Sequence, residues 1–167
     1  ANNTLEMLNA KNDKVYFETK VKPLERRNVH QWSMKGLAEN SPHKFVVVEN
    51  GANILVIDVA HGHHQNVIDM IRWCKDNLDS NVDIIAGNIA TAQAAIDLED
   101  AGADGLRVGI GGGSLCTTRV KTGFGIPNVS CLEEITSVAK TPIMADGGIR
   151  TSGDISKALA LGANTVM

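Results

Sequence analysis

The sequence has little aromatic content and few cysteines. Phe, Trp and Tyr make up 4% of its 167 residues, whereas glycine occurs 16 times. This balance argues against an all-β sandwich and favours an α/β protein with glycine-rich loops. The three cysteines, Cys74, Cys116 and Cys131, are odd in number and widely spaced, which is typical of a reducing compartment rather than of a disulfide framework. We therefore expect a cytoplasmic protein.

Long apolar runs and an excess of positive charge are also absent. No stretch of about 18 apolar residues occurs, so the sequence predicts no membrane span. It has no basic start followed by an apolar segment and a small-residue cleavage site, so we expect no secretory signal. The formal net charge is −3 and the Lys and Arg residues are scattered, which argues against a general nucleic-acid binder.

Residues 1–46 and residues 47–167 have different patterns. The first segment is rich in Asn, Lys and Glu and gives no confident secondary-structure element. In the second segment, short β-branched runs alternate with stretches of helical period. The expected strands are residues 54–57, 82–85, 106–108, 142–144 and 165–167. The expected helices are residues 67–78, 91–101, 130–139 and 152–161.

This alternation predicts parallel strands joined by right-handed crossovers, in either a doubly wound open sheet or a TIM (β/α)8 barrel. Polar or glycine-rich residues follow four successive strands: Asp58, Gly87-Asn88, Gly109–Ser114 and Asp146–Gly148. A barrel places such residues on one catalytic rim, whereas an open sheet concentrates its site at one switch point. We therefore favour the barrel. Because a full barrel takes about 250 residues, residues 47–167 should form its second half, with residues 1–46 an unassigned remnant or linker.

The segment 109–119, GIGGGSLCTTR, is the most informative motif. Its glycines allow backbone N–H groups to cradle a phosphate and backbone carbonyls to face a cation. Ser114 adds a hydroxyl donor for a phosphate, and Cys116 lies beside Arg119, where a thiolate is favoured. Composition alone leaves a second interpretation open, namely a flexible surface loop with an incidental cysteine.

Two other strand ends carry carboxylates. Asp146 could hold ribose hydroxyls and the following Gly147-Gly148 could meet a phosphate, although a tight turn with a capping Asp fits the same residues. Asp58 repeats the pattern and is followed by three histidines at 61, 63 and 64. These histidines lack a fourth ligand at a usual spacing, which favours a loop that touches a cofactor over a metal site.

Together, four motifs resemble those of the IMP dehydrogenase/GMP reductase family. Residues 109–119 look like the family's active-site cysteine loop, and residues 145–155 resemble its nucleotide-binding strand and the following helix. Residues 57–63 and 85–88 are similar to its preceding strand ends. The motifs occur in the family's order and at compatible spacing over about residues 47–167, which makes the resemblance far more specific than a single glycine-rich loop.

The resemblance implies roles for individual residues. Cys116 would add to carbon 2 of a bound purine nucleotide monophosphate, with Thr118 as the companion hydroxyl. The substrate would be held by Ser114, Asp146, Gly147 and Gly148, and the nicotinamide cofactor by Asp58, Asn88, Arg107 and Gly109. The backbone carbonyls of Gly111, Gly113 and Cys116 resemble the family's ligands for a potassium ion. The expected assembly is a homotetramer.

The expected reaction is the oxidation of IMP to XMP with NAD. The segment 121–125, KTGFG, leans toward the reductase branch, in which NADPH converts GMP to IMP and ammonia. A non-catalytic nucleotide-binding fragment and a flavin-dependent phosphate-binding barrel are further alternatives. In the family, a second phosphate-binding loop and a mobile flap with the water-activating residues follow the last strand found here. We therefore expect this segment alone to lack hydrolytic competence.

Overall fold

The computed structural model describes the backbone of residues 4–8, 14–18, 28–33 and 52–167, and the side chains from residue 52 onward. Two strands, β1 (Thr4–Leu8) and β2 (Lys14–Glu18), form an antiparallel pair. The other six strands form one parallel sheet in the order β3-β4-β5-β6-β7-β8. They are β3 (Asn28–Ser33), β4 (Ala52–Asp58), β5 (Asp83–Ile89), β6 (Gly105–Val108), β7 (Ile143–Ala145) and β8 (Thr165–Val166).

Helices connect the strands from β4 onward: α2 (Gln65–Asn77), α3 (Ala92–Asp100), α4 (Thr118–Thr122), α5 (Asn128–Thr136) and α6 (Ser152–Ala160). Local sequence fixes their starts. Thr91 accepts a hydrogen bond from the backbone of Ala94 as the N-cap of α3, as the sequence predicts. Thr151 and Asp154 form a reciprocal capping box at α6. Within the described residues, none of the helices has both the length and the apolar character that a membrane crossing requires.

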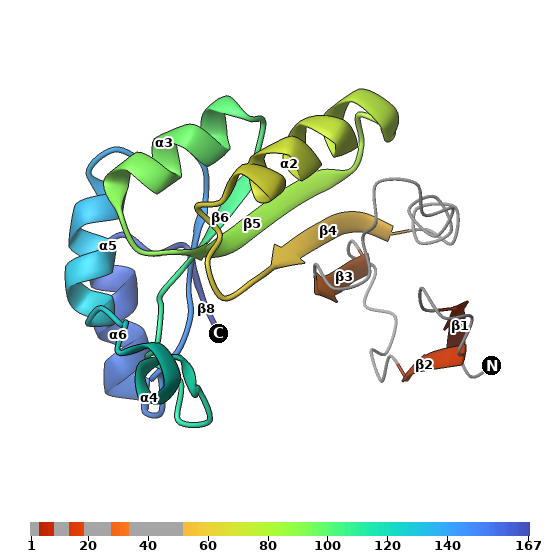
Figure 1. The fold of residues 1–167 in the computed structure, drawn as a ribbon. Helices are drawn as coiled ribbons and strands as arrows, with labels where there is room; N and C mark the ends of the chain where they lie inside the picture. Colours follow the sequence, from red (N-terminus) through yellow and green to blue (C-terminus); the bar gives the residue numbers. More distant parts are fainter. Residues whose placement is uncertain (1–3, 9–13, 19–27, 34–51) are drawn as a thin grey trace.

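The strand order follows the chain order without a switch point, and the helices lie around the outside of the curved sheet (Figure 1). A doubly wound sheet would reverse its strand order and carry helices on both faces. The expected class, an α/β fold with part of a β/α barrel, is therefore confirmed. The five expected strands are present. The structure adds β3, which pairs with β4 and comes from the segment that the sequence left unassigned.

The core lies between the sheet and the helices. Its fully buried side chains come from both layers and include Ile84, Leu106, Ile71, Leu98 and Ile135. Burial of each such side chain is worth roughly 1.5–3 kcal/mol, so the helix faces hold the sheet in its curved form. Cys74 and Cys131 are buried in this cluster, and Trp73 packs against it partly buried.

Polar side chains tie together the edge of the sheet at which the strands begin. Asp104 accepts a hydrogen bond from Ile84 N at 2.7 Å and pairs with Lys75. Asn164 Oδ1 accepts one from Ile143 N at 2.8 Å. Glu99 Oε1 accepts three bonds from residues 140 and 141, each at 2.8 Å. We call these three acceptors, Asp104, Asn164 and Glu99, the amino-edge ties.

Candidate active site

The strand register brings the expected site residues to the opposite edge, where the strands end. Asp58 lies across from Gly87, and Gly87 lies across from Arg107. Asp146 N then donates to Val108 O at 2.8 Å, which aligns the end of β7 with the end of β6. Carboxyl ends of parallel strands carry the active site in β/α barrels, so this edge is the candidate site.

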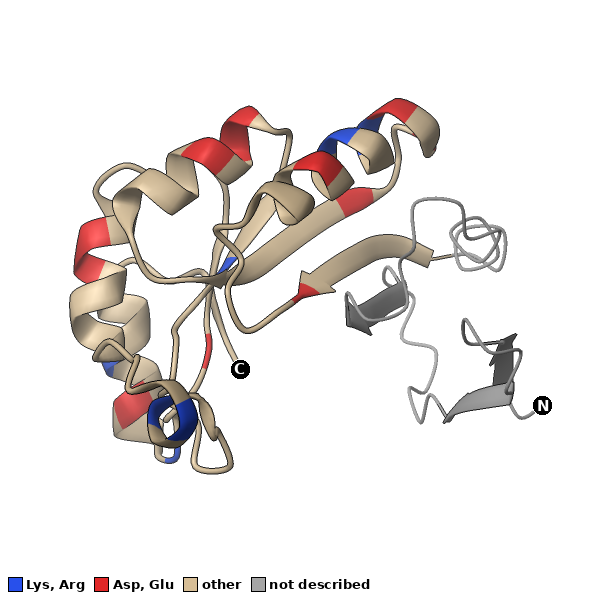
Figure 2. Ribbon diagram, in the orientation of Figure 1, with Lys and Arg blue, Asp and Glu red and all other residues tan. Residues whose placement is uncertain are grey.

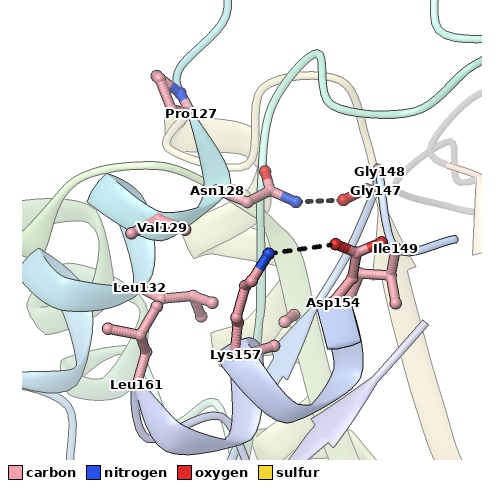
Figure 3. A pocket seen from close by; sticks show the side chains of 12 residues that line it. Pro127, Asn128, Val129, Leu132, Gly147, Gly148, Ile149, Asp154, Lys157 and Leu161 are labelled. Atoms are coloured by element: carbon pink, nitrogen blue, oxygen red, sulfur yellow. Dashed lines mark hydrogen bonds and ion pairs between the residues drawn. The ribbon is translucent and has the colours of Figure 1, made fainter. Parts of the chain in front are cut away.

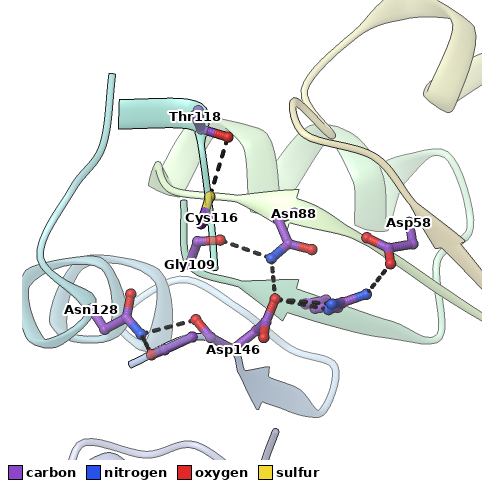
Figure 4. Close-up of polar contacts among 9 residues, drawn as sticks. Asp58, Asn88, Gly109, Cys116, Thr118, Asn128 and Asp146 are labelled. Carbon is purple, nitrogen blue, oxygen red and sulfur yellow. Dashed lines mark hydrogen bonds and ion pairs between the residues drawn. The ribbon is translucent and has the colours of Figure 1, made fainter. Parts of the chain in front are cut away.

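A buried arginine joins two of these strand ends through Asp58 and Asp146, which are labelled in Figure 4. Arg107, only 8% exposed, lies on β6 between the carboxylates of Asp58 and Asp146. Its Nη1 is 2.7 Å from Asp58 Oδ2, and its Nη2 is 3.0 Å from Asp146 Oδ2. Its Nε also donates to that Asp146 oxygen at 3.1 Å. Nε therefore orients Asp146 through a directed hydrogen bond, whereas Nη1 holds Asp58 as a close ion pair, because Nη1 makes no contact with hydrogen-bond geometry among the described residues.

Asn88 adds an amide to this cluster. It lies within β5 and is buried, rather than following the strand as the sequence predicts. Its Nδ2 donates to Gly109 O at 2.8 Å and to Asp146 Oδ2 at 2.5 Å (Figure 4). Its Oδ1 is buried and has no hydrogen-bond partner among the described residues. A buried unpaired acceptor costs about 1–3 kcal/mol, so this oxygen is a natural acceptor for a donor on a bound ligand.

Cys116 lies on the exposed loop between β6 and α4, at the same end of the sheet. Cys116 N donates to Gly113 O at 3.1 Å, and Cys116 Sγ lies 3.3 Å from Thr118 Oγ1, whose hydroxyl can donate to the thiolate form (Figure 4). The hydrogen bonds from the side chain and backbone of Thr118 lower the pKa of the Cys116 thiol, and the charge of Arg119 adds to the effect. By contrast, burial raises the pKa of Cys131. Only a thiolate is a strong nucleophile, so exposure and the direction of the pKa shift both favour reaction at Cys116 over Cys131.

The cysteine loop packs against the loop after β7, backbone to backbone. A Cβ on Gly147 would lie 3.0 Å from Gly113 N, and one on Gly148 would lie 2.9 Å from Gly112 O. A Cβ on Gly109, whose φ is 131°, would overlap Asp146 O. Glycine is required here by close approach as well as by φ, so the two loops form one surface.

The remaining predicted residues lie on this surface or beside it. Ser114 is exposed on the cysteine loop. The carbonyl of Gly113 accepts the bond from Cys116 N, which leaves its second lone pair for a cation. Backbone carbonyls are the ligands that potassium takes in proteins, so the loop carries donors of the type that potassium binds.

The histidines after β4 have local partners. His64 caps α2 by accepting from Asn66 N at 3.1 Å. His63 Nε2 is 2.7 Å from Asp97 Oδ2, and this bond, with a second one from Gln93, lowers the pKa of Asp97. In the described part of the chain, no group of three or more His, Cys, Asp or Glu side chains is placed to hold a metal ion.

The sequence did not single out Asn128. The structure places it at the start of α5, two residues before the predicted start, with its side chain on the loop after β7. It also lines a pocket of about 170 Å³ with Gly147, Gly148, Asp154 and Lys157 (Figure 3). An Asn shortly before an apolar run is a helix-start signal, but nothing in that pattern shows which loop the amide would reach.

Comparisons with known proteins agree with this arrangement. The family model for the IMP dehydrogenase / GMP reductase domain matches residues 28–167. The GMP reductase of Leishmania donovani is 53% identical over 133 residues, which cover 77% of this chain and 27% of that protein. The inosine-5'-monophosphate dehydrogenase of Rhodopirellula baltica is 52% identical over 124 residues, which cover 72% of this chain and 23% of that protein. The chain thus spans less than a third of the length of these relatives.

A solved structure matches as well. The crystal structure of GMP reductase from Trypanosoma brucei superposes with a TM-score of 0.75 and 46% sequence identity, covering 82% of this chain and 31% of that one. The family model covers far more than half of the chain, and both curated relatives exceed half identity. The chain therefore belongs to the IMP dehydrogenase/GMP reductase family of oxidoreductases.

Proposed function

We propose that this chain carries the nucleophile and much of the ligand-binding rim of an enzyme that oxidises IMP to XMP with NAD. The observation that carries the proposal is the Cys116 thiol, exposed and with a lowered pKa, at the same end of the sheet as the Asp58–Arg107–Asp146 cluster. A reactive thiol beside buried, oriented polar groups is the arrangement that covalent catalysis needs.

The reaction balances through one covalent adduct. The Cys116 thiolate adds to carbon 2 of IMP and forms a C–S bond. The hydrogen on that carbon then leaves as hydride, for which a nicotinamide cofactor, when bound, would supply the acceptor. Water hydrolyses the resulting thioimidate, which releases XMP and returns the cysteine. The sum is IMP, NAD and water giving XMP, NADH and a proton.

The substrate's phosphate has donors on the two packed loops. We assign it to the hydroxyl of Ser114 and the backbone of Gly147 and Gly148, with Asp146 on the ribose hydroxyls. The short helix α4, which directly follows the cysteine loop, carries Arg119 and Lys121 and no acidic residue, whereas α3 and α5 carry acidic residues and no Lys or Arg (Figure 2). Positive charge on α4 favours an anionic substrate at this end of the sheet.

The cofactor would bind over the other strand ends. We assign it to Asp58, Asn88 and Gly109, where the buried Oδ1 of Asn88 is available to a donor such as a carboxamide. Arg107 is engaged by two carboxylates, so we assign it to holding them in place beside the cofactor. The carbonyls of Gly111, Gly113 and Cys116 would bind potassium. A homotetramer and a cytoplasmic location stay predictions.

The second candidate is GMP reductase, in which Cys116 displaces ammonia from GMP and the adduct accepts hydride from NADPH to give IMP. The similarity to the Leishmania donovani and Trypanosoma brucei GMP reductases favours it. Both reactions use the same cysteine adduct, so the geometry of this edge supports either direction.

One set of assays on the full-length protein tests both directions. IMP with NAD should produce NADH, whereas a reductase would instead consume NADPH with GMP. Intact-mass measurement should find a nucleotide adduct on Cys116. The Cys116→Ala variant should lose the adduct and at least about 10³-fold in turnover. The buried Cys131→Ala variant is the matched control and should keep both. An adduct that persists in Cys116→Ala would refute the assignment.

A further inference from the structure

Asn128 contacts both of the loops that carry the proposed chemistry. Its Nδ2 donates to Asp146 O at 2.9 Å and to Gly147 O. Figures 3 and 4 show the amide reaching from the start of α5 to the loop after β7. The bonds go to two successive carbonyls immediately before Gly148, so they fix the backbone that is proposed to meet the phosphate.

The other side of the same amide faces the cysteine loop. A Cβ on Gly109 would lie 3.0 Å from Asn128 Oδ1, and a Cβ on Gly112 would also lie 3.0 Å from it. The amide therefore packs directly on the backbone that leads to Cys116. Its Oδ1 is buried and has no hydrogen-bond partner among the described residues. An ordinary structural asparagine would satisfy both ends of its amide.

We propose that Asn128 is a positioning residue, whose amide locks the phosphate loop against the cysteine loop so that a bound nucleotide meets Cys116 in the reactive geometry. The inference rests on the proposed function. Covalent attack needs the reacting atoms about 3–3.5 Å apart, and a displacement of about 1 Å can cost roughly 10²-fold in rate. Asn128 would set this distance because it contacts both loops.

A merely structural role makes a different prediction. If Asn128 served only to stabilise α5, its loss would lower the melting temperature, and the activity would fall only through the fraction of folded protein. A positioning role changes the rate of the covalent step in folded protein. It leaves the intrinsic reactivity of the thiol unchanged, because the bonds to Thr118 stay in place.

The test uses the full-length protein with the variants Asn128→Leu, which keeps the branched shape and loses the donor, and Asn128→Gln, which keeps the amide. Asn77→Leu is the matched control, since Asn77 Nδ2 also donates to a backbone carbonyl, Trp73 O at 2.9 Å, on the remote helix α2. For each protein we would measure the rate of nucleotide adduct formation at saturating IMP with NAD, or at saturating GMP. Alkylation of Cys116 by iodoacetamide without nucleotide, and the melting temperature, complete the set.

We expect Asn128→Leu to slow adduct formation by at least about 10-fold while nucleotide-free alkylation changes by less than about 2-fold. Asn128→Gln should recover part of the rate, and Asn77→Leu should match the wild type. Should Asn128→Leu fail to fold, Asn128→Asp keeps the shape without the donor and should show the same loss.

Adduct formation at the wild-type rate in Asn128→Leu would overturn the inference, as would equal losses in adduct formation and nucleotide-free alkylation. A wild-type protein that forms no adduct with either nucleotide refutes the proposed function, and the inference falls with it. The two failures are distinguishable, because the wild-type protein tests the proposed function and Asn128→Leu tests the inference.

Discussion

The two edges of the parallel sheet use polar side chains in different ways. At the edge where the strands begin, the amino-edge ties Asp104, Asn164 and Glu99 accept hydrogen bonds mainly from backbone N–H groups of neighbouring segments. At the edge where the strands end, side chains bind one another: Arg107 holds two carboxylates and Asn88 shares one of them.

The difference predicts that stability and reactivity depend on different edges of this sheet. At the first edge, the hydrogen bonds to backbone N–H groups hold neighbouring segments of the chain together. At the second edge the side-chain network leaves the buried Oδ1 atoms of Asn88 and Asn128 without a hydrogen-bond partner among the described residues. In β/α barrels, the strand ends carry catalysis and the strand starts carry stability. We therefore expect substitutions at the first edge to lower stability alone, and substitutions at the second edge to lower activity as well.

The largest effect should come from Arg107→Met. It removes the cation between Asp58 and Asp146 and leaves two partly buried carboxylates facing each other. We expect a loss of about 2–3 kcal/mol in the free energy of unfolding, less than for a fully buried pair because both carboxylates keep some exposure. Activity should fall as well. Denaturant unfolding and steady-state assays measure both, with the exposed Arg72→Met as control. Unchanged stability and activity would show that Arg107 does not organise the site.

Glu99→Ala tests the other edge. It deletes one carboxylate oxygen that accepts three hydrogen bonds from residues 140 and 141. We expect a loss of about 1–2 kcal/mol in the free energy of unfolding, with kcat/KM of the folded enzyme unchanged. Glu133→Ala, an exposed glutamate on α5, is the control for charge. A fall in kcat/KM at constant stability would contradict the separation between the two edges.

The smallest effect should come from Thr118→Val, which keeps the side-chain shape and removes the hydroxyl beside Cys116. Because that hydroxyl stabilises the thiolate, its loss should raise the pKa of Cys116 toward the ordinary value. Less thiolate is then present at neutral pH, so alkylation should slow by about 2- to 5-fold there and recover at high pH. The neighbouring Thr117→Val is the control. An unshifted pH profile would show that the threonine hydroxyl does not act on the thiol.

Sequence periodicity predicted much of the fold. The strands and helices from residue 52 onward follow apolar runs and caps such as Thr91, which are local signals. It did not predict β3, because a short polar-rich strand such as NVHQWS depends on its pairing with β4 rather than on its own pattern. Nor did it predict α4, which has no buried residue to produce a periodic pattern.

The site was predictable in part. The order of strand-end motifs indicated that Asp58, Gly109 and Asp146 would meet, since parallel strands align their ends. The position of Arg107 between the two carboxylates depends on the register of β6 with its neighbouring strands and on the face of the sheet to which its side chain points. Neither can be read from the sequence. Asn128 lies 18 residues from its main partner Asp146, so no local pattern could connect them.

Arg107 also has a consequence for assembly of the fold. Its charge is compensated by a carboxylate from β4 on one flank and by one from the end of β7 on the other. A nascent chain that has only the first flank in place would leave the Nε and Nη2 donors of this buried guanidinium without their acceptor. Partial sheets should therefore be disfavoured, and these strands should dock as a single cooperative unit.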